Sequence, residues 1–296
     1  MNVDGRREGT DEPYRVGVVG CGVMGAGTAE LCALRDLDVV VIGRQDTSIE
    51  SARTRLTSSL DRLAGKGRLT GPQCEAALSR VRFSTDLTAL GDRQIVVECV
   101  SEEEHVKREI FAALDEIVTD GDAVLASVTS SIPIIRLARA TARPGRVIGT
   151  HLFNPVPVMP LAELIPSLLT DEQTTLRAEK FLADLLGKQV IRAPDRSGFL
   201  VNTLLVPYLL SAIRILEAGT ASAADIDQAM VAGCGHPMGP LALVDLIGLD
   251  TIAHIANALY EEYKEPLYAA PPLLSRMVDA RLLGRKTGVG FHSYES

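Results

Sequence analysis

The 296-residue sequence contains no tryptophan, and aromatic residues make up only 4% of it. A surface that stacks bases or sugars on aromatic rings is therefore not expected. Positive charge is also scarce, because 30 lysines and arginines stand against 38 acidic residues and give a formal net charge of -8. This sign argues against a general nucleic-acid-binding protein. An acidic protein that holds an anionic ligand needs a local basic site.

The five cysteines are scattered, and no pair has the Cys-x-x-Cys spacing. We therefore expect reduced thiols in a cytoplasmic protein, with no disulfide framework and no metal site. Residues 1–13 are polar and charged, and they contain no apolar core of a secretion signal. The most apolar stretch, residues 199–216, is interrupted by Asn202, Pro207 and Arg214. A buried helix is expected there in place of a membrane span.

Short apolar runs alternate with helical patterns as far as residue 194. Strands are expected at residues 14–19, 39–42, 95–100, 123–127, 147–151 and 187–193. Helices are expected at residues 24–34, 48–63 and 106–118. Such alternation indicates crossover units on a mostly parallel sheet. The sequence therefore predicts an α/β fold in which residues 14–194 form a Rossmann-type dinucleotide-binding domain.

Strand signals almost disappear after residue 194. Helices are expected at residues 199–218, 225–232 and 242–263, and Ser222 with Asp225 has the spacing of a capping box. Residues 195–296 are therefore expected to form an all-helical domain for substrate binding and dimerisation. The helix at 199–218 is apolar on nearly every face, which a domain of this size does not cover alone. A homodimer that buries this helix is the simplest solution.

A glycine-rich turn, Gly-Cys-Gly-Val-Met-Gly, follows the first expected strand and opens the first expected helix. That context makes the Gly-x-Gly-x-x-Gly pattern a dinucleotide-binding signal. Gly20 permits a tight turn, Gly22 lets the backbone approach a pyrophosphate, and Gly25 lets the helix pack closely on the sheet. Val23 and Met24 lie where the expected helix opens, and free N–H groups there meet the phosphates. An ordinary glycine-rich loop is the alternative.

The residue after the second expected strand bears on the choice of nicotinamide cofactor. NAD-binding domains usually carry an acidic residue there, which hydrogen-bonds the adenosine ribose. This chain has Gly43 and Arg44 instead. Because an arginine pairs with the 2′-phosphate of NADP, Arg44 favours NADP over NAD. A solvent-facing Arg44 in an NAD-dependent enzyme is the alternative.

Several further segments carry recognisable motifs. They are Val-Glu-Cys-Val-Ser-Glu (97–102), Ser-Val-Thr-Ser-Ser (127–131), Gly-Thr-His-Leu-Phe-Asn-Pro-Val-Pro (149–157), Gly-Phe-Leu-Val-Asn (198–202), Gly-His-Pro-Met-Gly-Pro (235–240) and Gly-Arg-Lys-Thr-Gly-Val-Gly-Phe (284–291). From about residue 15 onward the chain therefore resembles the 3-hydroxyacyl-CoA dehydrogenase family, most closely its bacterial 3-hydroxybutyryl-CoA dehydrogenase branch. The resemblance implies reversible oxidation of an (S)-3-hydroxyacyl-CoA thioester with NAD or NADP.

The resemblance also implies roles for individual side chains in the reaction. His151 is the base that takes the hydroxyl proton, a task that suits histidine near neutral pH. Glu163 is its partner carboxylate, which fixes the tautomer and stabilises the imidazolium. Ser130 hydrogen-bonds the reacting oxygen. Asn202 helps to hold the thioester or the developing oxyanion.

Binding residues follow from the same resemblance. Contacts with the cofactor are implied for Glu102, Lys107, Ser130, Asn154 and Lys286. Contacts with the acyl-CoA substrate are implied for Ser59, Lys66, Ser130, Asn154 and Asn202. Lys66 would supply the local positive charge that an acidic protein otherwise lacks. Ser59, Lys66, Glu102 and Lys286 have ordinary surface roles as the alternative.

One position departs from the family pattern. The family usually reads Ser-Asn-Thr-Ser where this chain has Val128 in second place. The change removes an amide that donates and accepts hydrogen bonds, near the expected path of the cofactor. It leaves open a biosynthetic dehydrogenase that acts on a hydroxyacyl group bound to an acyl carrier protein. A non-catalytic cofactor-binding relative is the remaining alternative.

Overall fold

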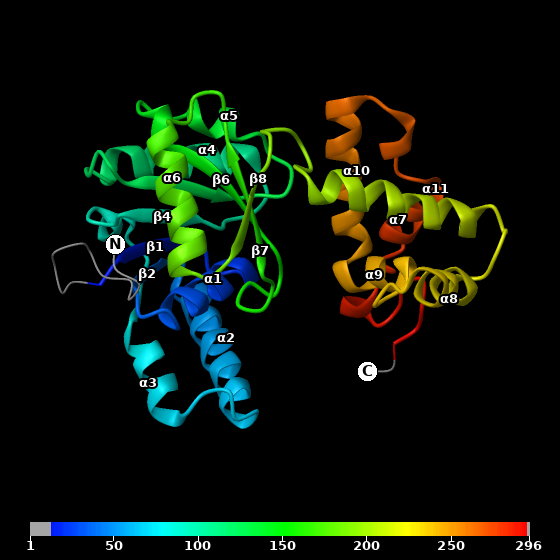
Figure 1. Cartoon of the computed structure of the whole chain (residues 1–296), viewed down its shortest axis with the longest axis horizontal. Coiled ribbons are helices and arrows are strands. Elements are labelled where there is room, and N and C mark those ends of the chain that lie inside the picture. The colour runs from blue at the N-terminus through cyan, green and yellow to red at the C-terminus, as the bar shows by residue number, and fades with distance from the viewer. Residues whose placement is uncertain (1–12, 295–296) are drawn as a thin grey trace. The chain divides into compact units, whose positions relative to one another are not determined.

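The computed structural model describes residues 13–294 and divides into two compact units (Figure 1). The first unit ends at Asp195 and the second begins at Arg196. Each unit has its own core of buried apolar side chains. The prediction that no secretion signal precedes the first strand concerns residues 1–13, of which all but the last lie outside the described residues.

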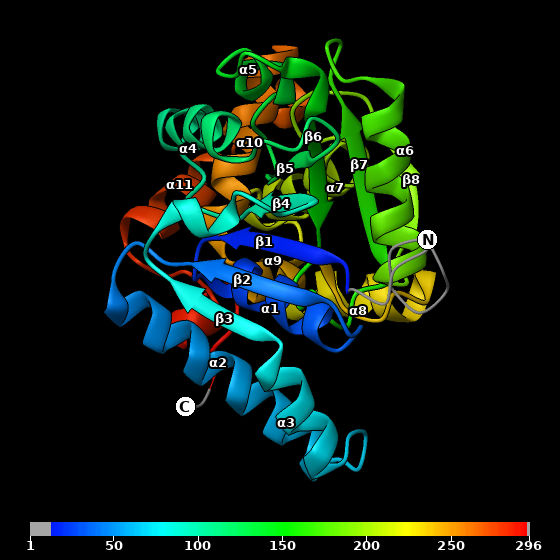
Figure 2. The same cartoon turned by 90° about the vertical axis from the view of Figure 1, so that its left-hand side faces the viewer.

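An eight-stranded sheet forms the first unit, in the order β3-β2-β1-β4-β5-β6-β7-β8 (Figure 2). The strands are β1 (Arg15–Val19), β2 (Asp38–Ile42), β3 (Val81–Ser84), β4 (Ile95–Glu98), β5 (Val124–Val128), β6 (Val147–Leu152), β7 (Leu161–Pro166) and β8 (Gln189–Arg192). All neighbouring strands are parallel except β6 and β7, which are antiparallel. The predicted Rossmann-type, mostly parallel sheet is confirmed.

Helices connect the strands of this sheet. They are α1 (Val23–Ala33), α2 (Asp46–Gly65), α3 (Gly71–Ser79), α4 (Glu104–Ile117), α5 (Ile134–Ala138) and α6 (Glu172–Lys180), with short helical turns at Leu87–Leu90, Pro144–Arg146 and Phe181–Leu185. The apolar strands β1, β2, β4 and β5 are almost wholly buried, as strands covered by helices on both faces are.

The sequence pattern does not predict β3 or β7. β3 is a short edge strand whose burial does not alternate cleanly with exposure. β7 has four buried residues in a row, and one of them is Glu163. A glutamate inside an apolar run argues against a buried strand, because Glu is almost never buried without a partner. The pattern of apolar residues therefore does not indicate β7.

The second unit is all-helical apart from isolated bridges. It contains α7 (Val201–Glu217), α8 (Ala223–Cys234), α9 (Pro240–Ile247), α10 (Leu249–Tyr263) and α11 (Pro272–Asp279), with short helical turns at Pro266–Tyr268 and Arg285–Thr287. The segment 242–263 is helical as predicted, but it is divided between α9 and α10. The chain breaks at Gly248, whose φ of 106° no continuous helix allows. Ser222 caps α8 by accepting a hydrogen bond from the Asp225 N–H at 3.2 Å.

Among the helices of residues 13–294, none is by itself both long and apolar enough to cross a bilayer. The helices α9 and α10 meet the criterion only when they are taken as one segment, and they are bent by 97° with respect to each other.

Candidate active site

The glycine-rich turn between β1 and α1 has the geometry of a dinucleotide cradle. Gly20 has a φ of 114°, and a Cβ there would lie 2.6 Å from the Cys99 carbonyl oxygen. A Cβ on Gly25 would lie 2.0 Å from the Gly20 oxygen, so α1 packs against the turn only because Gly25 has no side chain. Above Gly22, by contrast, a Cβ would meet no atom within 4 Å. The crowded glycines hold the turn, and the open one leaves room for a ligand.

The start of α1 suits the phosphates of a nicotinamide dinucleotide. No side chain caps its N-terminus, and its first turn contains no acidic residue. Backbone N–H groups there remain available to an anion. Val23, in this first turn, is 55% exposed, and Met24 is half-buried. The residues present therefore fit the cofactor that the motif implies.

Arg44 lies in the turn that follows β2. Its side chain is exposed, and within residues 13–294 it has no hydrogen bond or ion pair. The preceding Gly43 is tightly enclosed, since a Cβ there would lie 2.6 Å from Ile49 and 2.9 Å from the Cys21 sulfur. The turn after β2 thus packs against the glycine-rich turn. The guanidinium of Arg44 remains available for an anionic ligand.

His151 and Glu163 are direct cross-strand partners. His151 in β6 is paired in register with Glu163 in β7. The His151 Nδ1 lies 2.5 Å from Glu163 Oε2, and both side chains are buried. Because an ionised carboxylate only accepts hydrogen bonds, Nδ1 carries a proton and donates it to this contact. In a neutral ring, the tautomer that donates from Nδ1 leaves Nε2 as the proton acceptor.

Ser130 completes this arrangement at the other ring nitrogen. Its Oγ lies 3.3 Å from His151 Nε2. Ser130 follows β5, which is parallel to β6, so the ends of the two strands bring the two side chains together. The Phe153 ring packs against the imidazole, with 4.5 Å between ring centroids. The chain thus supplies an oriented base with a hydroxyl beside it, which suits proton transfer at a substrate oxygen.

Glu102 holds the segment that contains Ser130. One of its carboxylate oxygens accepts hydrogen bonds from the Thr129 hydroxyl at 2.5 Å, from the Ser130 N–H at 2.8 Å and from the Ser131 N–H at 3.2 Å. These hydrogen bonds occupy one carboxylate oxygen of Glu102 within the protein. Glu102 is half-buried, and its hydrogen bonds join it to this segment.

Val128 and Lys107 are in contact beneath this segment. The Val128 side chain belongs to the apolar core, and its carbonyl oxygen accepts a hydrogen bond from Lys107 Nζ at 2.9 Å. The side chain of Lys107 is fully buried. The valine therefore packs inside the unit and leaves the loop ordered by backbone and carboxylate contacts.

Asn154 lies in the exposed turn between β6 and β7. Lys188, which motif analysis does not single out, holds that turn. Its Nζ donates hydrogen bonds to the carbonyl oxygens of Val156 at 2.5 Å and Met159 at 2.6 Å. Burial lowers the pKa of Lys188, with nearby Arg35 acting in the same direction. No local pattern marks a lysine whose partners lie about thirty residues earlier in the chain.

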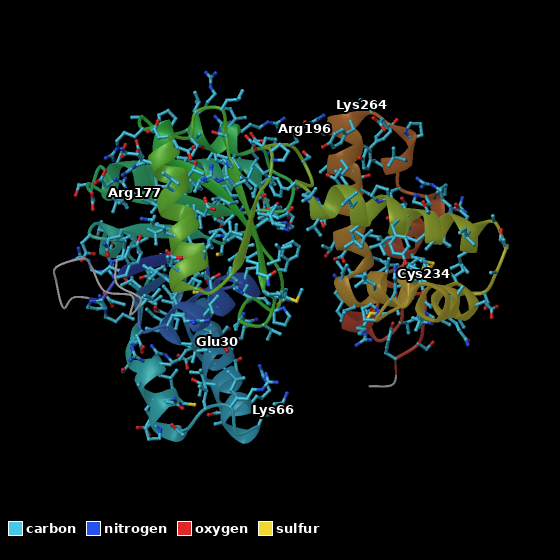
Figure 3. The ribbon with its side chains drawn as sticks, in the orientation of Figure 1. Glu30, Lys66, Arg177, Arg196, Cys234 and Lys264 are labelled. Atoms are coloured by element: carbon cyan, nitrogen blue, oxygen red, sulfur yellow. The ribbon has the colours of Figure 1, made fainter. Side chains whose placement is uncertain are left out.

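Ser59 and Lys66 lie near the C-terminal end of α2. The Ser59 hydroxyl donates to Glu30 Oε1 at 2.9 Å. Glu30, in α1, is only 5% exposed, and its burial raises its pKa, although the Ser59 hydrogen bond and Arg62 oppose that shift. Lys66 is exposed at the end of the helix (Figure 3). The structure thus ties Ser59 to the helix that begins in the glycine-rich turn.

The buried Glu30 has a consequence for stability. Because its folded-state pKa is raised, its contribution to the free energy of unfolding is fully present below the ordinary pKa and is lost as pH rises through the folded pKa. Glu30→Gln keeps an oxygen for Ser59 and removes the charge. We expect its melting temperature to exceed that of the wild type by about 2–4 °C at neutral pH, the effect of about 1 kcal/mol.

The gain should shrink as pH falls toward 4.5, the ordinary value for Glu. Thermal unfolding measured by circular dichroism across this pH range checks the expectation. Glu75→Gln, at an exposed position in α3, is the matched control. A gain that does not change with pH, or a loss of stability at neutral pH, would show that the buried charge of Glu30 is not costly.

Asn202 and Lys286 belong to the second unit. Asn202 is buried in the first turn of α7, where its N–H donates to the Gly198 carbonyl at 3.1 Å. Lys286 is exposed and forms an ion pair with Asp250. Asp245, which motif analysis does not single out, accepts the N–H groups of Phe291 and His292, both at 2.9 Å. It thereby ties the C-terminal segment to α9.

Metal chemistry receives no support from the side chains. Within the part of the chain that the structure describes, there is no group of three or more His, Cys, Asp or Glu residues that could hold a metal ion. The first unit brings His151, Glu163 and Ser130 into contact with one another.

Family models match both units. Residues 15–196 match the 3-hydroxyacyl-CoA dehydrogenase, NAD binding domain, and residues 198–294 match the C-terminal domain of the same family. This chain belongs to the 3-hydroxyacyl-CoA dehydrogenase family. It is therefore an oxidoreductase, and its first unit is the domain in which this family binds a nicotinamide cofactor.

Relatives within the 3-hydroxyacyl-CoA dehydrogenase family resemble it along nearly its whole length. A 3-hydroxybutyryl-CoA dehydrogenase of Mycobacterium tuberculosis (strain H37Rv) is 55% identical over 285 residues, which cover 96% of this chain and 100% of that protein. The crystal structure of M. tuberculosis FadB2 gives a TM-score of 0.94 at 55% identity and covers 95% of this chain and 99% of that one. The (S)-3-hydroxybutyryl-CoA dehydrogenase of Ralstonia eutropha gives 0.90 at 43% identity, with 96% and 99% covered.

Proposed function

We propose that this chain interconverts short-chain (S)-3-hydroxyacyl-CoA and 3-ketoacyl-CoA thioesters with a nicotinamide cofactor. The observation that carries the proposal is the position of His151 between Glu163 at 2.5 Å and Ser130 at 3.3 Å. An imidazole oriented by a carboxylate, with a hydroxyl at its other nitrogen, suits oxidation of an alcohol. The relatives named as 3-hydroxybutyryl-CoA dehydrogenases support a short acyl chain.

Each residue of the site has a separate role in the proposed reaction. His151 Nε2 accepts the proton of the substrate hydroxyl, and Glu163 stabilises the imidazolium that forms. The Ser130 hydroxyl donates a hydrogen bond to the same substrate oxygen. Asn202 holds the thioester carbonyl with its side-chain amide. A bound nicotinamide supplies the acceptor for the hydride of the substrate carbon.

Purified protein assayed with acetoacetyl-CoA tests the proposal. We expect consumption of the reduced nicotinamide, followed by its absorbance, and formation of the S product. Absence of turnover with both NADH and NADPH, in protein that still binds the cofactor, would instead indicate a non-catalytic relative.

The alternative substrate is a hydroxyacyl group on an acyl carrier protein. The departure from the family pattern at Val128 suggests this alternative. In the structure, the Val128 side chain packs in the core, and its carbonyl oxygen accepts a hydrogen bond from Lys107. Nothing in this placement calls for a different thioester. A comparison of rates on acetoacetyl-CoA and on the acetoacetyl carrier protein separates the two. We expect the CoA ester to react faster, and a strong preference for the carrier would reverse the assignment.

The contacts of the two ligands form part of the same proposal. For the cofactor we assign Gly20, Gly22, Val23, Met24, Gly25, Arg44, Glu102, Ser130, Asn154 and Lys286. For acyl-CoA we assign Ser59, Lys66, Ser130, Asn154 and Asn202. Lys66 is exposed, which leaves its charge available to the phosphates of coenzyme A.

We expect NADPH to bind more tightly than NADH, because the free guanidinium of Arg44 follows β2, where an acidic residue would repel a 2′-phosphate. Arg44→Ala should weaken NADPH binding by about 10–100-fold, the loss of a charge-assisted hydrogen bond worth about 1.5–3 kcal/mol. Its affinity for NADH should hardly change. Fluorescence titration with both cofactors measures this. Arg139→Ala, also at an exposed position, is the control, and equal wild-type affinities for NADH and NADPH would contradict the preference.

A homodimer is proposed from the exposed face of α7. Leu204 is 69% and Ile215 is 43% exposed, and their spacing places them on the same face of the helix. In a symmetric dimer, the same face of α7 in each copy would bury Leu204 and Ile215 of the other copy in a self-complementary contact. We expect Leu204→Glu to convert the dimer to a monomer in light scattering after size exclusion. Leu168→Glu, at a 96% exposed leucine of the first unit, should leave the dimer intact.

A cytoplasmic location is also proposed. It rests on the odd number and scattered positions of the cysteines, which are typical of proteins in a reducing compartment. Fractionation of cells that produce the protein would test it.

A further inference from the structure

An ion pair lies wholly inside the first unit, beneath the serine segment of the active site. Lys107 is in the first turns of α4, and Glu98 is the last residue of β4. Lys107 Nζ lies 2.9 Å and 3.0 Å from the two carboxylate oxygens of Glu98, and neither side chain is exposed. Fully buried charged side chains are rare in proteins unless they are paired with each other.

The hydrogen-bonding capacity of this pair is used up within the protein. The third bond of the Lys107 ammonium goes to the Val128 carbonyl at 2.9 Å, and an ammonium has only three protons to donate. Glu98 also accepts from the Ser127 hydroxyl at 2.7 Å and from the Val100 N–H at 2.6 Å. Lys107 therefore has no proton left for a ligand, and its full burial keeps it from the surface on which a cofactor would lie.

Both members of the pair hold residues that lead to the active site. Glu98 binds the side chain of Ser127 and Lys107 binds the carbonyl of Val128, two residues before Ser130. Lys107 also lies 3.6 Å from Glu102, the carboxylate that accepts the Ser130 N–H. Ser130 in turn contacts His151. The contacts are continuous from the buried pair to the base.

We propose that Glu98 and Lys107 position the Ser130 segment against His151, and that Lys107 acts on the reaction through this segment and not by touching the cofactor. The inference rests on the proposed function, because it assumes that Ser130 and His151 meet the substrate. Glu98 lies within the Val-Glu-Cys-Val-Ser-Glu segment (97–102) but received no role there, and it becomes a positioning residue. Lys107 changes from a predicted cofactor contact to a second positioning residue.

A contribution to the stability of the fold does not by itself explain why Glu98 and Lys107 are buried as an ion pair. Burial raises the pKa of Glu98 in spite of the opposing effect of Lys107, so the desolvation of the carboxylate is only partly offset. Replacing both members of such a pair by neutral groups is often neutral or stabilising, whereas removing one member is strongly destabilising. Folding and positioning can therefore be separated by comparing a single and a double substitution.

Lys107→Met leaves the Glu98 carboxylate buried without its partner, so we expect a lower melting temperature. Glu98→Gln combined with Lys107→Met removes both charges, and much of that loss should be recovered. Turnover of acetoacetyl-CoA should fall by about 10²-fold in both proteins, the effect of a small misplacement of a reacting group. The dissociation constant of the reduced cofactor should stay close to that of the wild type. Lys180→Met, at an exposed position in the same unit, is the matched control.

Amide hydrogen exchange adds a readout that needs no turnover. The N–H groups of Ser130, Ser131 and Ile132 are bonded to Glu102 or to the Thr129 hydroxyl. We expect them to exchange faster in the double variant, with the rest of the sheet unchanged. Ser127→Ala, which removes one hydrogen bond and no charge, provides a second variant should Lys107→Met fail to fold. It should also speed exchange of these amides without weakening cofactor binding.

Two outcomes would overturn the inference. If the double variant regains wild-type turnover together with its stability, the pair serves folding alone. If cofactor binding weakens about tenfold or more while the amides of the segment exchange as before, Lys107 contacts the cofactor directly; tenfold corresponds to about 1.4 kcal/mol. Failure of the proposed function looks different, because the wild type itself would then not turn over acetoacetyl-CoA, and the exchange experiment would still test the positioning.

Discussion

Replacing His151 by alanine is expected to reduce turnover of acetoacetyl-CoA by about 10²–10⁴-fold, the usual contribution of a general base or acid. His151 Nε2 faces Ser130, and its Nδ1 is held by Glu163, so alanine removes the group that accepts the substrate proton in the proposed reaction. Cofactor affinity should hardly change, because the glycine-rich turn that holds the phosphates is untouched. Steady-state rates and a cofactor titration on the same preparation measure both quantities.

His254→Ala is the matched control for this variant. His254 is exposed in α10, and its removal should leave the rate unchanged. Full activity in His151→Ala would remove this histidine from the mechanism. A rate loss that is accompanied by an equal loss of cofactor binding would mean that the substitution disturbs the fold of the first unit.

Replacing Glu163 by glutamine should have a comparable effect, about 10²–10⁴-fold on turnover, by analogy with the loss of a triad carboxylate. The carboxylate only accepts hydrogen bonds, so it selects the ring tautomer with a proton on Nδ1. A glutamine can donate its amide N–H to Nδ1, and His151 then carries its proton on Nε2, where it cannot accept one from the substrate. The substitution preserves size and packing, so the rate reports the tautomer.

Thermal unfolding and turnover should be measured together for Glu163→Gln. Glu116→Gln, at an exposed position in α4, controls for the loss of one negative charge. Wild-type turnover in Glu163→Gln would reduce the cross-strand pair to a structural contact. A melting temperature close to that of the wild type, together with slow turnover, would support the orienting role.

Features decided by neighbouring residues were predictable from the sequence. The glycine-rich turn is one, because Gly20 has a positive φ and Gly25 packs directly against the Gly20 oxygen, both within one strand–turn–helix unit. The buried strands β1, β2, β4 and β5 are others, since strands covered on both faces need continuous apolar runs. The change to an all-helical second unit was also visible, because the period of the apolar residues changes there.

Features decided by distant residues were not predictable in the same way. The strand β7 was not predicted because its buried Glu163 is paired with His151 of the neighbouring strand β6, a contact that the local sequence does not show. The break at Gly248 escaped because one glycine in an apolar helical pattern is often tolerated. The roles of Lys188 and Glu98 were not predicted, because their hydrogen-bond partners lie in other strands and turns.

The sequence by itself determined the two-part organisation, the dinucleotide turn and, through its motifs, the family to which the chain belongs. These follow from local backbone requirements and from the period of apolar side chains. Only the tertiary structure decided how His151 and Glu163, twelve residues apart, become direct partners, because the antiparallel register of β6 and β7 sets that contact. It also decided that Lys107 is buried against Glu98 and Val128, since burial depends on strands and helices that meet only when the sheet is assembled.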